Sequence, residues 1–161
     1  MLVAYETLSE ASKIWMYPSS RKFYPQEMEA LHEKLTEFIT NWKTEDPDFS
    51  ASYQLLHNRF VVFVTAEGAV LSNADIDAQV SFVLTLQNTY DVVLIDKMNV
   101  CFKQGIHVQY KDLKEFKKLL KNRAVTAKTI VFDNLIHTKE ELENFWELPI
   151  EDTWYNRFLK K

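Results

Sequence analysis

Two β-rich runs decide the fold of this chain: SASYQLLH at residues 50–57 and RFVVFVTA at residues 59–66. Valine, phenylalanine, tyrosine and leucine dominate these runs, and β-branched and aromatic residues favour strands. The runs meet at His57-Asn58, where asparagine tolerates the left-handed backbone conformation that a tight turn needs. The sequence therefore predicts an antiparallel hairpin near the centre of the chain.

A strand and a helix are expected before this hairpin. KIWMY at residues 13–17 reads as the strand, and Pro25 suits the first turn of the helix. From Met28 onward the apolar positions form one helical stripe, with spacings of three or four residues or one. The stripe consists of Leu31, Leu35, Phe38, Ile39 and Trp42.

A second helix is expected to begin in LSNADIDAQVSF, residues 71–82, with Asn73 or Asp75 capping its first backbone N–H groups. We expect Phe82 and Leu86 to widen its apolar face. The residues predicted to point inward are Ile76, Val80, Val83, Leu84 and Tyr90.

The rest of the chain contains four further elements. VCFKQGIHVQY predicts a second hairpin around Gln104-Gly105, and KDLKEFKKLLKNR predicts a third helix. KTIVFDN reads as a strand, and Thr138 with Glu141 forms a capping-box signature at the start of a short fourth helix. Leu113, Phe116, Leu119 and Leu120 are the residues of the third helix expected to face inward.

The order strand, helix, hairpin, helix, strand matches the ferredoxin-like βαββαβ pattern, in which helices cover one face of an antiparallel sheet. No repeat or Pro/Gly/Ser linker divides the 161 residues. A single domain of that size buries about 70% of the surface its unfolded chain exposes. We therefore expect residues 1–161 to form one α+β domain: a mainly antiparallel sheet with helices packed on it, and C-terminal additions to a ferredoxin-like core.

Composition and charge exclude several classes of protein. The formal net charge of −4 argues against a general nucleic-acid binder, which needs clustered lysine and arginine in excess. The single cysteine, Cys101, lies in the apolar run VCF and fits a reducing cytoplasm. No signal-peptide pattern opens the chain, and nowhere is there an apolar run of about 18 residues, the length that a membrane span needs. We expect a cytoplasmic protein with no membrane span.

Polar residues in three loops are the candidates for a ligand site. A helix start explains Asp75 and Asp77, because carboxylates are favoured there and residues two apart point away from each other. They would share a pocket only with a partner from another element, and Arg21 in the loop YPSSRKF is the best candidate, since arginine clamps carboxylates and phosphates. The candidate ligand-binding residues are Arg21, Ser19, Ser20, Asp75, Asp77, Asp96 and Lys97.

Each of these candidates also has an ordinary structural interpretation. Arg21 is equally consistent with a solvated turn residue. Asp96-Lys97 in LIDKMN is consistent with a loop between helix and strand or with a buried ion pair.

Two segments are candidates for contact with a partner. The helix predicted at residues 111–123 is locally basic, so its outer face is either solvated or meets an acidic partner or RNA. The aromatic residues of WYNRF at 154–158 either seal the core or anchor a partner. The candidate interaction residues are Trp154, Tyr155, Arg157, Phe158, Lys114, Lys118 and Lys121.

The sequence has no recognisable catalytic or metal-binding motif. A two-residue turn at Gln104-Gly105 would place Cys101 and His107 on opposite faces of the sheet, which argues against a thiol–imidazole pair. The four histidines lie far apart, and C-x-x-C, H-E-x-x-H and G-x-S-x-G motifs are absent. We expect no catalytic residue, no metal and no cofactor.

The expected function is therefore that of a non-enzymatic protein-interaction or regulatory domain, acting on a protein partner or as a homodimer. The alternative is a small-ligand-binding protein or enzyme with a polar pocket around Arg21, Asp75 and Asp77.

Three stretches resemble a family of functionally uncharacterised bacterial proteins of about this length. They are KIWMYPSSRKF (13–23), DKMNVCFKQG (96–105) and TIVFDNLIHTKEELENFWELPIEDTWYNRF (129–158). Members of this family often carry the label "ABC transporter ATPase". The resemblance spans nearly the full chain but includes no motif of known chemistry, so it implies no catalytic residues.

ABC-type ATP hydrolysis is not expected from this chain. A P-loop cradles phosphates with the backbone of G-x-x-x-x-G-K-[ST], whereas the two glycines here, Gly68 and Gly105, are followed by alanine and isoleucine. LSNAD at 71–75 shares only its first two residues with the ABC signature LSGGQ. The purified protein should release phosphate from Mg-ATP no faster than a denatured control. Turnover above that control, abolished by a point substitution, would contradict this prediction.

Overall fold

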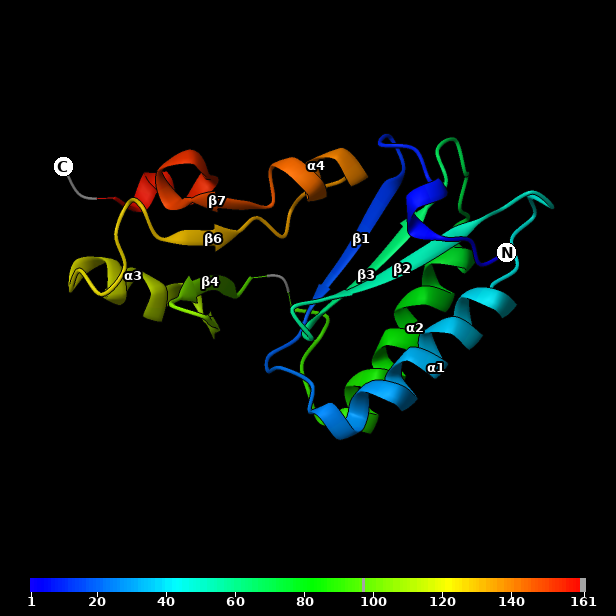
Figure 1. Cartoon of the computed structure of the whole chain (residues 1–161), viewed down its shortest axis with the longest axis horizontal. Coiled ribbons are helices and arrows are strands. Elements are labelled where there is room, and N and C mark those ends of the chain that lie inside the picture. The colour runs from blue at the N-terminus through cyan, green and yellow to red at the C-terminus, as the bar shows by residue number, and fades with distance from the viewer. Residues whose placement is uncertain (97, 160–161) are drawn as a thin grey trace.

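The predicted hairpin lies at the centre of the fold. The structure is a computed structural model that describes residues 1–96 and 98–159. Strands β2 (Ala51–Leu56) and β3 (Phe60–Thr65) pair in antiparallel fashion. His57 and Asn58 in the connecting loop both have left-handed backbones, with φ of 51° and 54°, as the turn prediction requires. Strand β1 (Lys13–Pro18) pairs with the other edge of β3, so the first sheet has the order β1-β3-β2 (Figure 1).

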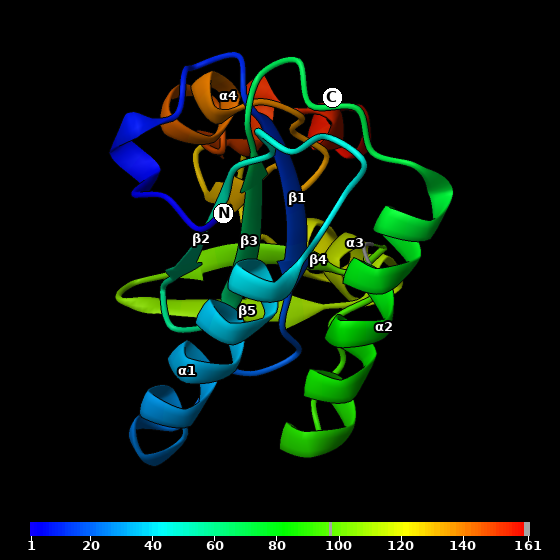
Figure 2. The same cartoon turned by 90° about the vertical axis from the view of Figure 1, so that its right-hand side faces the viewer.

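Helices α1 (Pro25–Asn41) and α2 (Asn73–Tyr90) lie side by side over one face of this sheet (Figure 2). The predicted stripe of α1 is confirmed, since Leu31, Leu35 and Ile39 are fully buried. A second sheet, of order β5-β4-β6-β7, packs against the opposite face of the first. Its elements and the remaining helices are β4 (Val100–Gln104), β5 (His107–Lys111), α3 (Leu113–Lys121), β6 (Ile130–Phe132), α4 (Lys139–Asn144) and β7 (Glu147–Pro149), with the 3-10 turns η1 (Tyr5–Thr7), η2 (Ile150–Asp152) and η3 (Trp154–Phe158).

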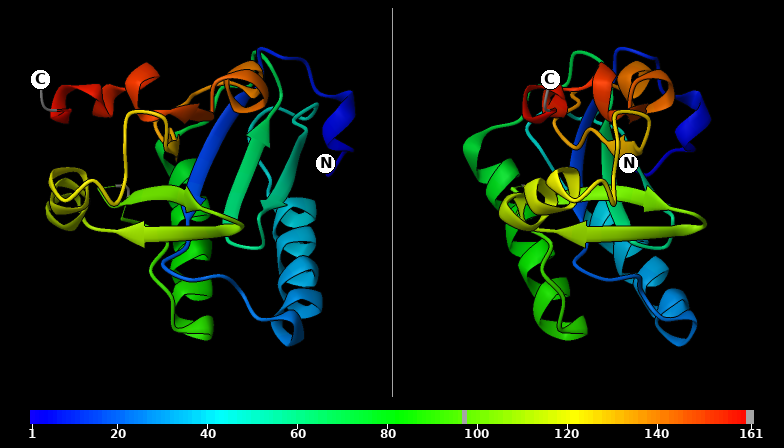
Figure 3. Two further views of the ribbon diagram at one scale, coloured as in Figure 1. Left: turned by 60° about the vertical axis from the view of Figure 1, so that its left-hand side comes forward. Right: turned by 90° about the vertical axis from the view of Figure 1, so that its left-hand side faces the viewer.

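The resulting molecule has four layers: helices, sheet, sheet and helix. Figure 3 shows the β4–β5 hairpin running across the strands of the first sheet. Alternation along the strands builds these layers, because successive side chains point to opposite faces. On β3, Val61 and Phe63 pack under the helices, whereas Phe60 and Val62 meet the second sheet. Phe102 on β4 points away from the first sheet and is buried against α3.

Arg59 connects the two sheets from a buried position. Its Nη1 donates to the Val108 carbonyl on β5 at 2.6 Å, and its Nη2 donates to the Ser19 carbonyl at 3.2 Å. Its side chain is 6% exposed, and burial lowers the pKa of its guanidinium. Backbone carbonyls rather than a carboxylate therefore accept hydrogen bonds from the two Nη groups of this buried cation, while its Nε is buried without a partner among the described residues.

The α+β class and the antiparallel sheets are confirmed, but the ferredoxin-like pattern holds only as far as α2. A fourth strand would pair with β1 in that fold. Here β4 pairs with β5 and β6 in the second sheet, and the edge of β1 is partly taken by the His137 carbonyl, which accepts from the Ile14 N–H at 2.8 Å. The physical reason is that the second face of the first sheet carries large apolar residues, which the second sheet covers.

Two local predictions were wrong: the position of one turn and the inward face of α2. The β4–β5 hairpin turns at Gly105-Ile106 instead of Gln104-Gly105, because Gln104 pairs with His107. Gly105 has φ of 61°, a conformation that glycine adopts at no steric cost. On α2, Leu84 is 42% exposed, and the inward stripe consists of Gln79, Val83, Leu86 and Tyr90.

A polar residue, Gln79, interrupts the apolar stripe of α2. Its amide oxygen accepts a 2.6 Å hydrogen bond from the Tyr17 hydroxyl, so a polar residue occupies a fully buried position. Apolar patterning does not select such a residue.

No helix in the described part of the chain is both long and apolar enough to cross a membrane.

Phe60 joins the two sheets, and its truncation should destabilise the whole molecule. The ring is fully buried, with its centroid 4.9 Å from that of Phe132 and 4.8 Å from that of Trp146. Phe60→Ala should lower the free energy of unfolding by about 3–5 kcal/mol, measured by urea denaturation with far-UV circular dichroism and tryptophan fluorescence. Ile106→Ala, at a side chain that is 94% exposed, is the control and should change stability by less than about 0.5 kcal/mol. Two separate transitions in the Phe60→Ala protein would contradict a shared core.

Candidate functional site

Arg21 belongs to a network that joins the loop before α1 to the end of α2. Its guanidinium pairs with both oxygens of Glu27, at 3.0 and 3.2 Å, and donates to the Tyr90 carbonyl at 2.5 Å. It also lies 4.2 Å from the centroid of the Tyr24 ring. Hydrogen bonding to Arg21 lowers the pKa of Glu27. These contacts use the fork of donors with which an arginine would clamp a ligand.

Ser19 and Ser20 hold the same loop in place. The Ser19 hydroxyl donates to the Arg21 carbonyl at 2.6 Å. The Ser20 hydroxyl accepts from the Val93 N–H at 2.9 Å, and the Ser20 N–H donates to the Val93 carbonyl at 3.0 Å. Both side chains therefore contribute to the internal structure of the loop.

Asp75 is part of a helix cap. The N-cap of α2 is Ser72, whereas the sequence predicted Asn73 or Asp75. The Ser72 hydroxyl accepts from the Asp75 N–H at 3.1 Å, and the Asp75 carboxylate accepts from the Ser72 N–H at 2.9 Å. This reciprocal capping box satisfies two backbone donors at once. Asp77 is exposed and makes no hydrogen bond or ion pair with the residues that the structure describes.

The predicted ligand site does not assemble. Arg21 contacts α2 at Tyr90, whereas Asp75 lies in the first turn of the same helix. Positions 75 and 90 are 15 residues apart, which corresponds to about 22 Å at a rise of 1.5 Å per residue. Asp96 accepts from the Met98 N–H at 2.8 Å, and Lys97 lies outside the described residues. The pocket expected around Arg21, Asp75 and Asp77 is therefore not formed.

The predicted interaction residues, by contrast, come together from two separate segments. The Phe116 ring of α3 packs against the Tyr155 ring of η3, with centroids 5.5 Å apart, and the Lys117 ammonium lies 4.5 Å from the centroid of the Phe158 ring. A pocket of about 400 Å³ opens between the two segments and is lined by Lys117, Lys118, Lys121, Arg157, Phe158 and Leu159. We call these six residues, together with Trp154, the α3–η3 surface. Lys114, the remaining predicted interaction residue of α3, is exposed and does not line the pocket.

The aromatic residues of the tail divide between core and surface. Tyr155 packs into the cluster behind α3, and burial raises the pKa of its hydroxyl to about 12. Trp154 is 45% exposed. The Arg157 guanidinium lies 4.2 Å from the centroid of the Trp154 indole, and its Nε donates to the Trp154 carbonyl at 3.1 Å. Tyr155 therefore holds η3 in place, while Trp154 remains at the surface.

Among the described residues, the cations of this pocket have no acidic partner. Lys117, Lys118, Lys121 and Arg157 form no ion pair with any carboxylate within residues 1–96 and 98–159. Lys117 was missing from the predicted contact residues, although its position four residues before Lys121 places it on the same helix face. No sequence pattern indicates that Leu159 lines the pocket, because its position depends on how the C-terminal segment folds back onto α3.

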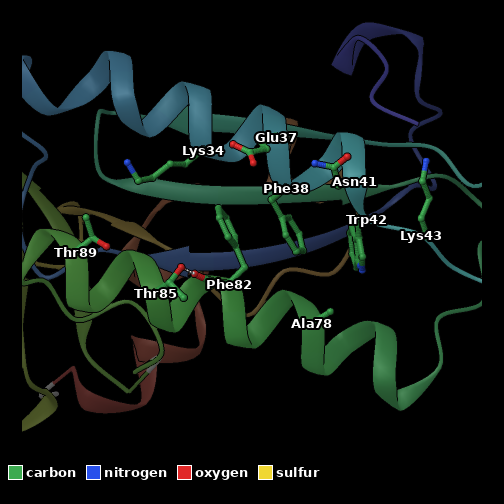
Figure 4. A pocket seen from close by; sticks show the side chains of 10 residues that line it. All are labelled: Lys34, Glu37, Phe38, Asn41, Trp42, Lys43, Ala78, Phe82, Thr85 and Thr89. Carbon is green, nitrogen blue, oxygen red and sulfur yellow. Dashed lines mark hydrogen bonds between the residues drawn. The ribbon is translucent and has the colours of Figure 1, made fainter.

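A further pocket of about 610 Å³ lies between α1 and α2 (Figure 4). Phe38 and Phe82 stack in it, with centroids 4.4 Å apart and ring planes 8° from parallel. Lys34 and Glu37 are on its rim. Since the rim carries both positive and negative side chains, its charge favours neither an anionic nor a cationic ligand. The other lining residues are Asn41, Trp42, Lys43, Ala78, Thr85 and Thr89.

Sequence reasoning missed a cluster of ionisable side chains between the sheets. Glu147 on β7 accepts from His57 Nε2 at 3.1 Å and pairs closely with Lys103 on β4. Burial alone would raise the pKa of Glu147, but the hydrogen bonds from Lys103 and His57 outweigh burial, and the pKa is lowered. No pattern within one segment indicates this cluster, because its members come from three distant parts of the chain.

Cys101 and His107 lie apart, and the Cys101 thiol is protonated at neutral pH. Cys101 is fully buried, and burial raises the pKa of its thiol to about 11, so the nucleophilic thiolate is scarce at neutral pH. Cys101 pairs with Tyr110 while His107 pairs with Gln104, which keeps cysteine and histidine on opposite faces. Among the described side chains, no three histidine, cysteine or acidic groups gather as a metal would require.

No protein-family model matches this chain, and neither a curated protein nor a solved structure matches it. The resemblance to the proteins labelled "ABC transporter ATPase" therefore stays a prediction, and the case for a function rests on the chain's own geometry.

The Glu147 cluster should stabilise the protein in a pH-dependent way. Since the folded pKa of Glu147 is depressed, its contribution is present above the unfolded value near 4.5 and is lost as the pH falls through the folded pKa. Glu147→Gln should cost about 1 kcal/mol at pH 7, a figure kept small because the side chain is 33% exposed. Urea denaturation at pH 7 and at pH 3 measures the effect, which should be smaller at pH 3. Glu33→Gln on the exposed side of α1 is the control, and a loss equal at both pH values would contradict the assignment.

Proposed function

We propose that this chain is a non-enzymatic protein-interaction domain that binds an acidic segment of a protein partner through the α3–η3 surface. One observation carries the proposal. Four cationic side chains from two separate segments line a single pocket, and within the described part of the chain none of them pairs with a carboxylate.

The charge of this pocket supports an acidic partner. Like charges gathered in one place repel each other, and a partner of opposite sign relieves that repulsion. Overall composition does not explain the gathering, because the chain as a whole carries a formal charge of −4. A local positive patch on an acidic protein also steers acidic partners toward one face.

Apolar residues beside the cations support a protein partner. Trp154 is 45% exposed, and Phe158 and Leu159 line the pocket. Tryptophan and arginine are, with tyrosine, the residues enriched among those that dominate binding energy at interfaces. The stacking of Arg157 on Trp154 restricts both side chains before binding, which reduces the entropy that association costs.

We place the domain in the cytoplasm, because its single cysteine is a buried free thiol and the sequence has no second cysteine with which it could pair. The partner is a different protein in this proposal, and self-association of the acidic chain is an outcome that the test distinguishes.

Charge reversal on the α3–η3 surface should abolish binding of an acidic peptide. The probe is a fluorescein-labelled peptide of alternating glutamate and leucine, followed by fluorescence anisotropy at low salt. Wild-type protein should bind it, and Lys121→Glu/Arg157→Glu should weaken binding by at least about tenfold, because two attractions become repulsions. Lys22→Glu/Lys43→Glu makes the same change in net charge elsewhere and is the matched control.

Several outcomes would refute the proposal. Equal weakening by both double variants would show that only net charge matters. Tight binding of a single-stranded RNA of the same charge, with none of the peptide, would reassign the surface to nucleic acid. A dimer in sedimentation analysis that the Lys121→Glu/Arg157→Glu protein cannot form would assign the surface to a second copy of the chain.

A further inference from the structure

We infer that the pocket of the α3–η3 surface recognises a phosphate group carried by a peptide of the partner, an inference that rests on the proposed function and names the chemistry of its central contact. The first reason is the amount of charge. A carboxylate carries one negative charge and two acceptor oxygens, whereas a phosphorylated side chain carries −1.5 to −2 and three strong acceptors at neutral pH. Four cations around about 400 Å³ match the phosphate group better.

The second reason is how the arginine is held. Arg157 stacks on Trp154, and its Nε hydrogen bond to the Trp154 carbonyl fixes the plane of the guanidinium. Among residues 1–96 and 98–159, no protein acceptor takes a hydrogen bond from its two Nη groups. A planar fork with both outer nitrogens available is the geometry with which arginine binds phosphate in bidentate fashion.

The third reason is the arrangement of the lysines. Lys117 and Lys121 are one turn apart on α3, and Lys118 lies beside them. The negative end of the α3 dipole explains a preference for lysine in its last turn, but it explains neither Lys117 nor the approach of Arg157 from η3. The dipole amounts to about half a charge, so the four unit charges of the pocket outweigh it.

The pocket wall favours a phosphopeptide over a nucleic acid. Bases bind single-stranded nucleic-acid sites by stacking on open aromatic faces. The Trp154 indole is covered by Arg157 and meets Tyr155 and Phe158 edge to face, with centroids 5.3 and 5.2 Å away. Phe158 and Leu159 instead offer an apolar wall, which suits a hydrophobic residue next to the phosphorylated one.

Three fluorescein-labelled peptides of one acidic sequence, with serine, phosphoserine or glutamate at the central position, test the inference. For wild-type protein, the phosphoserine peptide should bind about tenfold more tightly than the glutamate peptide, and inorganic phosphate should displace it. Arg157→Lys keeps the charge but loses the fork and the stacked geometry, so it should remove most of this preference. Lys114→Gln, on the same helix but outside the pocket, should keep it.

The outcomes separate this inference from the proposed function. Equal binding of the phosphoserine and glutamate peptides would overturn the phosphate site and leave the acidic-partner function standing. Binding of none of the three peptides would overturn both. Loss of the preference in Lys114→Gln as well as in Arg157→Lys would overturn the pocket as its origin. Thermal unfolding of each variant, expected to match the wild type because these side chains lie at the surface, shows that the comparisons concern folded protein.

Discussion

The burial of β3 on both faces is the constraint on which the rest of this structure depends. All six of its residues are shielded from water, and each fully buried valine or phenylalanine side chain stabilises the fold by roughly 1.5–3 kcal/mol. One face requires α1 and α2, and the other requires the second sheet. Neither layer alone would keep water from this strand, which is why a chain of 161 residues builds four layers.

This layering determines where a contact surface can form. The second sheet faces β3 on one side, so its other side needs a cover of its own, which α3 and η3 supply through Phe116 and Tyr155. These two anchors turn the lysines of α3 and the arginine of η3 toward solvent on the outermost layer. The residues that hold the layer and the residues that we propose for binding are therefore different.

The pairing of charges distinguishes this surface from the other polar clusters of the chain. Arg21 is matched by Glu27, Lys103 by Glu147 and Lys128 by Glu151, and the two Nη groups of buried Arg59 donate to carbonyl oxygens. Each of these groups has its partner within the folded chain. The pocket cations of the α3–η3 surface have no such partner among the described residues, and a cluster of one sign has a physical reason to recruit the opposite sign from outside.

Local patterns by themselves determined helices α1 to α4, the α+β class and every strand except β7, because alternation, the 3.6-residue stripe and turn residues such as Asn58 act within a few positions of the chain. The same patterns indicated the basic helix and the aromatic tail as separate candidates. They left open that Arg21 and Asp75 lie at opposite ends of α2, that β4 begins a second sheet, and that Arg157 lines the same pocket as Lys121. Only the tertiary structure decided these points, because contacts between distant segments depend on which apolar faces cover each other, and a sequence pattern describes one face at a time.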